Sequence, residues 1–150
     1  MNILITFVAQ DLIYITSIFV IFYILLKNKN KKFIVDILYV SLSTSIAWCM
    51  ANILKNIFKT TRPEQAQYIL SKSESIYAFP SGHTAYLFAM ATALYFYNKK
   101  LAYIIYVIGI AVGTARVYIG VHYPIDILGG IAVGISVGLL TNFIYKKIRN

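Results

Sequence analysis

Apolar residues run in long stretches along the chain, and short polar segments separate them. An α-helix needs roughly 20 such residues to span the hydrocarbon core of a bilayer. Five stretches approach or reach that length: one within residues 3–26, strongest from Leu12 to Leu26, and others at about 33–54, 81–97, 101–121 and 125–145. The pattern therefore predicts an all-α, polytopic transmembrane helical bundle of about five spans, of which the span at 81–97 is the shortest.

The polar segments differ in charge between the two ends of this bundle. With five spans, segments 27–32 and 98–100 and the C-terminal tail share one face, and they hold nine of the 14 Lys and Arg residues (four, two and three). Cytoplasmic loops are enriched in these residues. The sequence therefore predicts a cytoplasmic C-terminus, and it places the N-terminus, loop 55–80 and loop 122–124 on the outer face.

The composition agrees with a membrane protein. Of the 150 residues, 59% are hydrophobic and only 13% are charged, and the mean hydropathy is +0.71. A soluble domain of this size could not bury so much apolar surface, so we expect a single integral membrane domain over residues 1–150. The net charge of +9 favours anionic lipid headgroups as partners. Nucleic acid is not expected, because no soluble face exists to present a basic patch.

Small residues within the apolar stretches carry structural information. Cys49 is the only cysteine, which excludes a disulfide within the chain and gives no indication of a cysteine metal site. We expect it to be a small buried hydrophobe. Glycines recur at four-residue spacing, at Gly109 and Gly113 and again at Gly130, Gly134 and Gly138. This spacing predicts helices that pack closely within one bundle.

The N-terminus has no Lys or Arg before its apolar stretch, so we expect a retained helix rather than a cleaved signal peptide.

Residues that are rare in this chain gather at helix ends on the predicted outer face. They are both histidines, the three prolines, two of the three arginines and one aspartate: His83, His122, Pro63, Pro80, Pro124, Arg62, Arg116 and Asp126. Ionisable residues at membrane depth are costly and usually functional. Their concentration on one face therefore indicates a functional site.

Part of this group has the chemistry of a phosphate-binding site. Lys55, Arg62 and Arg116 supply three cations, and the planar guanidinium matches phosphate oxygens. Ser81 and Gly82 stand at the start of a predicted helix, where free N–H groups and the positive end of the helix dipole favour an anion. Any one of the cations is explained equally well by extension to the lipid headgroups, but the combination favours phosphate binding.

The two histidines have the positions of a nucleophile and an acid. His122 and Asp126 are four residues apart at the start of the last predicted helix, so the carboxylate can accept from one imidazole nitrogen and leave the other free to attack. Taken alone, the pair is also explained by a helix-capping aspartate beside an interfacial histidine. His83 opens the predicted span 81–97, where it is either a general acid or an interfacial histidine.

Three segments resemble, in order and spacing, the signatures of the type 2 phosphatidic acid phosphatase (PAP2) superfamily. They are KNIFKTTRP (55–63), PSGH (80–83) and ARVYIGVHYPID (115–126). The first two match the family's pattern fully, and the third departs once, because Ala115 stands where the family usually has a serine that contacts phosphate. The resemblance spans about residues 55–126 and implies the helical core that this superfamily shares with vanadium haloperoxidases.

The resemblance also implies a mechanism that needs no metal ion and no other cofactor. His122 would be the nucleophile that forms a phosphohistidine, Asp126 would orient it, and His83 would protonate the leaving group. The phosphoryl oxygens would be held by Lys55, Arg62, Ser81, Gly82 and Arg116. Family members usually have six spans, so this chain looks as if the first were missing, which leaves the site on the outer face.

A site at the outer interface of a chain with almost no soluble part faces lipid headgroups. The resemblance implies a membrane lipid phosphatase, and we expect undecaprenyl diphosphate as the substrate, because an outer site suits recycling of a carrier released outside. Lipid A, phosphatidylglycerol phosphate and phosphatidic acid are the alternatives. Loop 63–80 has only Glu64, Lys72 and Glu74 as charged residues, so it offers few groups that could distinguish one lipid headgroup from another. The expected location is the bacterial cytoplasmic (inner) membrane, with the site on the periplasmic face.

Two other classes fit less well. A haloperoxidase shares the motif set, but those enzymes are soluble and this chain has spans. A channel, transporter or lipid-binding scaffold could use a ring of cations, yet it would not need two histidines at these spacings. Nothing in the sequence indicates an oligomeric state.

Overall fold

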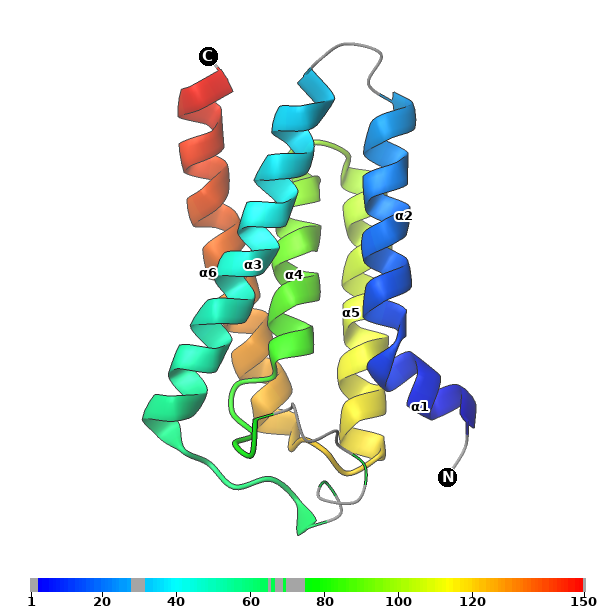
Figure 1. Ribbon diagram of the computed structural model, residues 1–150, viewed down its shortest axis with the longest axis vertical. Helices are drawn as coiled ribbons and strands as arrows, with labels where there is room; N and C mark the ends of the chain where they lie inside the picture. The colour runs from blue at the N-terminus through cyan, green and yellow to red at the C-terminus, as the bar shows by residue number, and fades with distance from the viewer. Residues whose placement is uncertain (1–2, 28–31, 65, 67–68, 70–74, 150) are drawn as a thin grey trace.

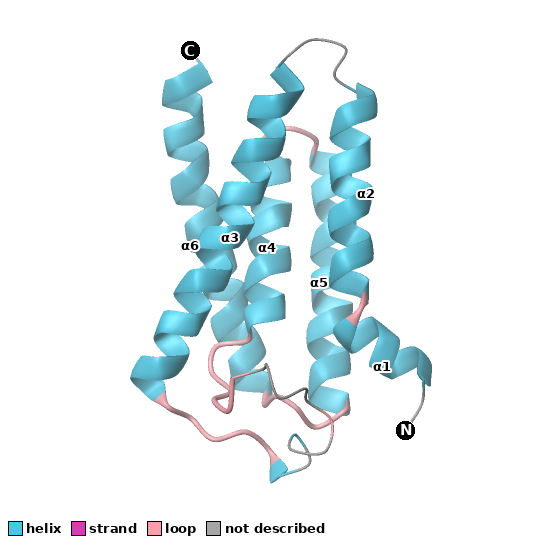
Figure 2. Cartoon of the chain, viewed as in Figure 1, coloured by secondary structure: helices cyan, strands magenta, loops and turns pink. Residues whose placement is uncertain are grey.

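A computed structural model describes residues 3–27, 32–64, 66, 69 and 75–149. Within these ranges the regular secondary structure is helical, apart from one isolated β-bridge between Thr61 and Tyr77 (Figure 2). The helices are α1 (Ile3–Gln10), α2 (Leu12–Lys27), α3 (Lys32–Phe58), α4 (Gly82–Tyr95), α5 (Lys99–Tyr118) and α6 (Pro124–Arg149). The predicted all-α class is therefore confirmed.

Helix α4 is the centre of the bundle. It packs against α3, α5 and α6 (Figure 1), and 12 of its 14 residues are buried. A helix of this length measures about 21 Å, which is less than the roughly 30 Å of a hydrocarbon core. Because other helices enclose α4, it need not reach across the bilayer by itself.

The number of membrane spans is approximate. Among the described residues, α3, α5 and α6 are long and apolar enough to cross a membrane, and α1 and α2 make a fourth crossing if they are counted together. The first predicted span, within residues 3–26 and strongest from Leu12 to Leu26, consists of two helices, because the chain bends by 53° between α1 and α2. The break falls at Asp11, a residue type that competes with helical hydrogen bonds.

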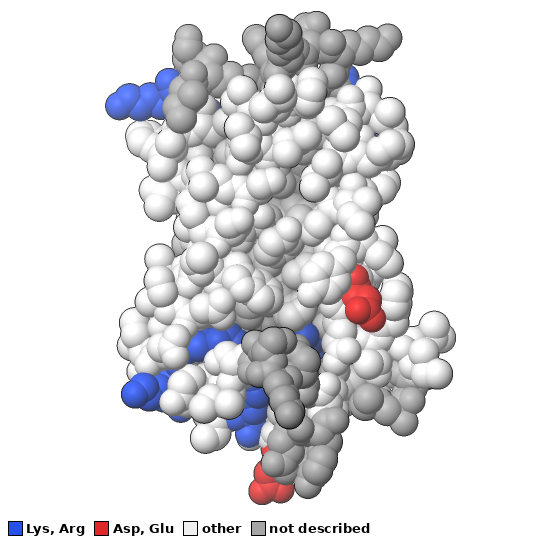
Figure 3. All heavy atoms as spheres, in the orientation of Figure 1, with Lys and Arg blue, Asp and Glu red and all other residues white. Residues whose placement is uncertain are grey.

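The two ends of the bundle carry different segments. The ends of α2 and α6, the start of α3 and the α4–α5 connection lie at one end, whereas α1, the end of α3, the start of α4 and the α5–α6 turn lie at the other (Figure 1). Lys and Arg gather at these ends, and the band between them is almost uncharged (Figure 3). Large apolar side chains such as Ile18, Phe22 and Leu38 are more than half exposed in this band, which suits contact with lipid.

The predicted glycine face of α6 is confirmed. A Cβ added at Gly130 would stand 2.6 Å from the carbonyl oxygen of Ser81, and one at Gly134 would stand 2.5 Å from that of Ala85. Helix α6 therefore approaches the backbone of α4 as closely as only glycine permits. This contact fixes the start of α6, and with it Asp126, beside the start of α4.

Cys49 does not have the environment expected from the sequence. It is exposed on α3, so the expectation of a buried cysteine was wrong. In a membrane helix both the packed face and the lipid-facing side are apolar, so an apolar run by itself does not distinguish them.

Candidate active site

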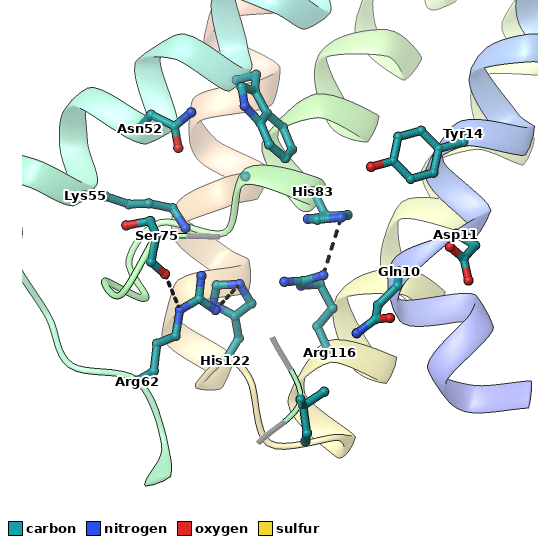
Figure 4. A pocket seen from close by; sticks show the side chains of 13 residues that line it. Gln10, Asp11, Tyr14, Asn52, Lys55, Arg62, Ser75, His83, Arg116 and His122 are labelled. Carbon is teal, nitrogen blue, oxygen red and sulfur yellow. Dashed lines mark hydrogen bonds between the residues drawn. The ribbon is translucent and has the colours of Figure 1, made fainter. Parts of the chain in front are cut away.

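A cavity of about 510 Å³ opens at the end of the bundle that carries the α3–α4 loop and the α5–α6 turn (Figure 4). Of the eight residues that the sequence predicts for a site, six line it: Lys55, Arg62, Gly82, His83, Arg116 and His122. The other two, Ser81 and Asp126, are buried next to it, with 0% and 1% of their surface exposed. Folding thus brings all three sequence motifs to one cavity.

His122 lies in the turn between α5 and α6, and Asp126 lies in the first turn of α6. The imidazole Nδ1 is 3.1 Å from Asp126 Oδ2, and the same oxygen accepts from the backbone N–H of Tyr123 at 2.8 Å. The carboxylate therefore caps α6 and holds the histidine at once. Because a carboxylate is an acceptor, Nδ1 carries the proton, and Nε2 keeps its lone pair for the cavity.

Arg62 stands beside that unprotonated nitrogen. Its Nη1 donates to the carbonyl oxygen of Val121 at 2.8 Å and lies 3.4 Å from His122 Nε2. Its Nε donates to the carbonyl oxygen of Ser75 at 2.9 Å. Carbonyl groups of the α3–α4 loop and of the α5–α6 turn thus hold the guanidinium next to the predicted nucleophile.

Arg116, in the last turn of α5, has the same relation to the second histidine. It is fully buried, and its Nη1 lies 3.4 Å from His83 Nε2. The same Nη1 donates to the carbonyl oxygen of Ala9 at 3.1 Å. In an unbroken helix this carbonyl would accept from the N–H four residues later, so the break at Asp11 makes it available to Arg116.

The start of α4 presents His83 to the cavity. Ser81 is the N-cap: its hydroxyl accepts from the N–H of Thr84 at 3.5 Å and from the Thr84 hydroxyl at 3.1 Å. Its own N–H donates to the carbonyl oxygen of Asp126 at 2.9 Å. Ser81 therefore shapes the helix start and joins α4 to α6, while Gly82 and His83 line the cavity itself.

Lys55 completes the set of cations. It lies in the last turn of α3, is only 5% exposed, and donates from Nζ to the carbonyl oxygen of Tyr77 at 3.3 Å. The pKa of His122 is lowered to about 3, and burial of the imidazole is the largest cause. The hydrogen bond to Asp126 acts in the opposite direction and raises the pKa, whereas the positive charges of Arg116, Arg62 and Lys55 lower it further. The imidazole is therefore neutral near pH 7, as a nucleophile requires.

Several residues that line the cavity were missed from the sequence. Trp48 and Asn52 share a face of α3 with Lys55 at helical spacing, and this spacing was a signal that could have found them. Gln10, Asp11 and Tyr14 come from the broken first helix; a carboxylate within an apolar run could have indicated Asp11. Trp48 packs edge-on against His83, with ring centroids 5.4 Å apart.

Lys72 and Glu74, two of the charges expected in loop 63–80, lie outside the described residues. Among the residues that the structure does describe, no three His, Cys, Asp or Glu side chains come together as a metal site requires.

A buried histidine–carboxylate pair, a second histidine and three cations surround one cavity at this end of the bundle. The profile of the PAP2 superfamily matches residues 35–149. The chain belongs to this superfamily, as its three motifs indicate.

Individual relatives are lipid phosphatases. The chain is 38% identical over 63 residues to undecaprenyl-diphosphatase BcrC of Bacillus subtilis (strain 168), which is 42% of this chain and 33% of that protein. It is 34% identical over 108 residues to phosphatidylglycerophosphatase B of the same organism, covering 65% and 52% of the two chains. The chain thus spans between a third and about half of these two relatives.

The fold has a solved counterpart. The crystal structure of the first transmembrane PAP2 type phosphatidylglycerolphosphate phosphatase, from Bacillus subtilis, superimposes with a TM-score of 0.66 at 27% identity. The match covers 96% of this chain and 74% of that one. The helical core around α4 is therefore that of a membrane PAP2 protein.

Proposed function

We propose that residues 1–150 form a single membrane phosphatase domain that hydrolyses a phosphorylated lipid through a phosphohistidine, without a metal ion. One observation carries the proposal: His122 has Asp126 on Nδ1 at 3.1 Å and the guanidinium of Arg62 beside Nε2 at 3.4 Å. A fixed, neutral imidazole with a cation beside its lone pair is suited to attack a phosphoryl group.

The first step forms the N–P bond. His122 Nε2 attacks phosphorus and the bond from phosphorus to the leaving oxygen breaks. His83, which the bound phosphate anion would hold as an imidazolium, gives a proton to that oxygen and becomes neutral. The imidazole of His122 becomes positively charged, and Asp126 stabilises this charge through Nδ1. In the second step His83 takes a proton from water, the resulting hydroxide attacks phosphorus, and the N–P bond breaks to release phosphate.

Charge moves onto the phosphoryl oxygens in both steps. Lys55, Arg62 and Arg116 are already held by backbone carbonyls, so they need little rearrangement when substrate binds. Fixed donors of this kind contribute most when they are aimed at the charge that develops in the transition state. This arrangement supports phosphoryl transfer over simple lipid binding.

We propose undecaprenyl diphosphate as the substrate and undecaprenyl phosphate as the product. The site has one guanidinium beside each histidine, Arg62 at His122 and Arg116 at His83. This pairing suits a diphosphate, whose leaving group is itself a phosphate next to His83. The similarity to an undecaprenyl-diphosphatase supports the same choice.

A phosphatidylglycerol phosphate phosphatase is the second candidate, favoured by the similarity to the solved structure. Lipid A and phosphatidic acid complete the set of substrates to compare. Phosphate release by the purified protein from these four lipid phosphates tests the proposal. We expect the highest kcat/KM for undecaprenyl diphosphate, inhibition by orthovanadate and no inhibition by EDTA. Release from none of the four, or loss of release in EDTA, would overturn it.

For the cellular arrangement we propose the bacterial cytoplasmic (inner) membrane, with the site on the outer face and the C-terminus in the cytoplasm. The excess of Lys and Arg at the opposite end of the bundle supports this orientation.

A further inference from the structure

A second, smaller cavity of about 190 Å³ adjoins the catalytic one. It is lined by Ile13, Tyr14 and Ser17 of α2, Trp48 of α3, and His83 and Tyr86 of α4, and we call it the aromatic groove. Tyr14, Trp48 and His83 line both cavities. A ligand held in the catalytic cavity can therefore continue into the aromatic groove.

The groove leads away from the charged end of the bundle. Ser17 and Tyr86 each lie three residues beyond a residue shared with the catalytic cavity, Tyr14 on α2 and His83 on α4, which is about 4.5 Å along a helix. Both helices run from the site toward the opposite end of the bundle (Figure 1). Tyr14 is 65% and Trp48 38% exposed, so the groove also opens to the outer surface of the bundle, where lipid would lie.

The deep end of the groove offers little to a polar ligand. The Ser17 hydroxyl donates to the carbonyl oxygen of Ile13 at 2.7 Å and lies 3.0 Å from the Tyr86 hydroxyl. Since the serine proton is already used, the tyrosine donates to the serine oxygen. These two polar groups satisfy each other, and the groove presents mainly aromatic rings and aliphatic carbon.

We propose that the aromatic groove binds the first isoprenoid unit of the substrate, with Ser17, Trp48 and Tyr86 as specificity-determining residues. This assignment rests on the proposed function of the catalytic cavity. The groove meets that cavity at His83, where the leaving group would lie, so hydrocarbon must follow the leaving phosphate directly. A prenyl chain is hydrocarbon from its first carbon, whereas a diacylglycerol places a glycerol and two esters there.

The size of the groove agrees with one unit rather than a whole chain. An apolar cavity of about 150 Å³ binds a single benzene ring, so a groove of about 190 Å³ has room for a group of similar size. One five-carbon isoprenoid unit fits this space, and the rest of the chain would leave through the opening beside Tyr14 into the bilayer.

The test compares two detergent-soluble substrates, farnesyl diphosphate and dioctanoyl phosphatidic acid, with the full-length protein. Ser17→Leu adds carbon to the groove, and Tyr86→Leu removes a ring from it. We expect either change to lower kcat/KM for farnesyl diphosphate about tenfold or more, as misfits in apolar pockets do. The loss should appear in KM, because the chain is bound equally in the ground and transition states, and it should exceed the loss for phosphatidic acid.

Ser136→Leu is the matched control, because Ser136 is exposed on α6 and lies outside both cavities. It should leave both substrates unchanged. If the groove variants lose kcat/KM equally for the two substrates, the isoprenoid assignment is overturned. It is also overturned if only kcat for farnesyl diphosphate falls, or if neither kcat nor KM for this substrate changes. Turnover of phosphatidic acid by the same variants shows that they fold. If the wild-type protein hydrolyses neither substrate, the proposed function itself fails, which is a different result.

Discussion

Arg116 donates a hydrogen bond to the carbonyl oxygen of Ala9, a residue 107 positions earlier in the chain. The carbonyl is available because the first helix breaks at Asp11, and the same guanidinium nitrogen lies 3.4 Å from His83. The N-terminal helix pair therefore helps to hold a buried cation of the candidate active site, in addition to crossing the apolar band.

This relationship predicts a strong effect of Arg116→Lys. A lysine keeps the charge but lacks the planar fork, so it cannot hold the Ala9 carbonyl and meet His83 and phosphate in the same geometry. We expect kcat/KM for phosphate release to fall about 100-fold or more. Lys146→Arg, at the opposite end of the bundle, is the control and should have no effect. Near-normal turnover by Arg116→Lys would show that charge alone suffices.

Asp126→Asn tests the orienting role of the carboxylate. The amide can still cap α6, but it no longer stabilises a positive imidazole or enforces the proton on Nδ1. We expect kcat to fall about 10²- to 10⁴-fold, while lipid binding, measured with a non-hydrolysable phosphonate analogue, is retained. Turnover close to wild type would mean that Asp126 serves only as a helix cap.

The lowered pKa of His122 predicts how stability depends on pH. The unfolded chain takes up a proton near the ordinary histidine value of about 6.5, whereas in the folded protein this pKa is about 3. The unfolded state thus binds more protons between these values, and stability falls as the pH drops through this window. We expect the thermal midpoint of wild type in detergent to fall more steeply from pH 7 to pH 4 than that of His122→Gln. Identical slopes would contradict the lowered pKa.

The proposed orientation is tested with single cysteines. Cys49 is exposed, so it is first replaced by serine, and Lys27→Cys and Glu64→Cys then mark the two ends of the bundle. In intact cells an impermeant maleimide should label the cysteine at 64, and it should label the one at 27 only after permeabilisation. The opposite pattern would reverse the topology.

The sequence predicted which residues come together at one cavity better than it predicted the helices around them. The four-residue spacing of His122 and Asp126 allowed their contact, although taken alone it was also explained by a helix-capping aspartate beside an interfacial histidine. Lys55, Arg62 and Arg116 were grouped because cations at one membrane face are costly and rarely accidental. Their common cavity follows from the predicted order of the spans.

Features that depend on tertiary contacts could not be predicted in this way. The break at Asp11 leaves the carbonyl oxygen of Ala9 available to Arg116, which is far along the chain. The spacing of apolar residues does not indicate that contact. The N–H of Ser81 donates to the carbonyl oxygen of Asp126 on another helix, and the local sequence around Ser81 does not contain that contact. The side of α3 that carries Cys49 could not be assigned, because lipid and protein interior are equally apolar.

The central claim is that His122 carries the phosphoryl group during turnover. The most direct measurement is rapid alkaline quenching after mixing with a diphosphate lipid labelled in its terminal phosphate, followed by mass spectrometry of the peptide that contains the α5–α6 turn. We predict acid-labile, alkali-stable label on His122, and neither label nor phosphate release in a folded His122→Ala variant. Label on another residue, or normal turnover by His122→Ala, would contradict the account.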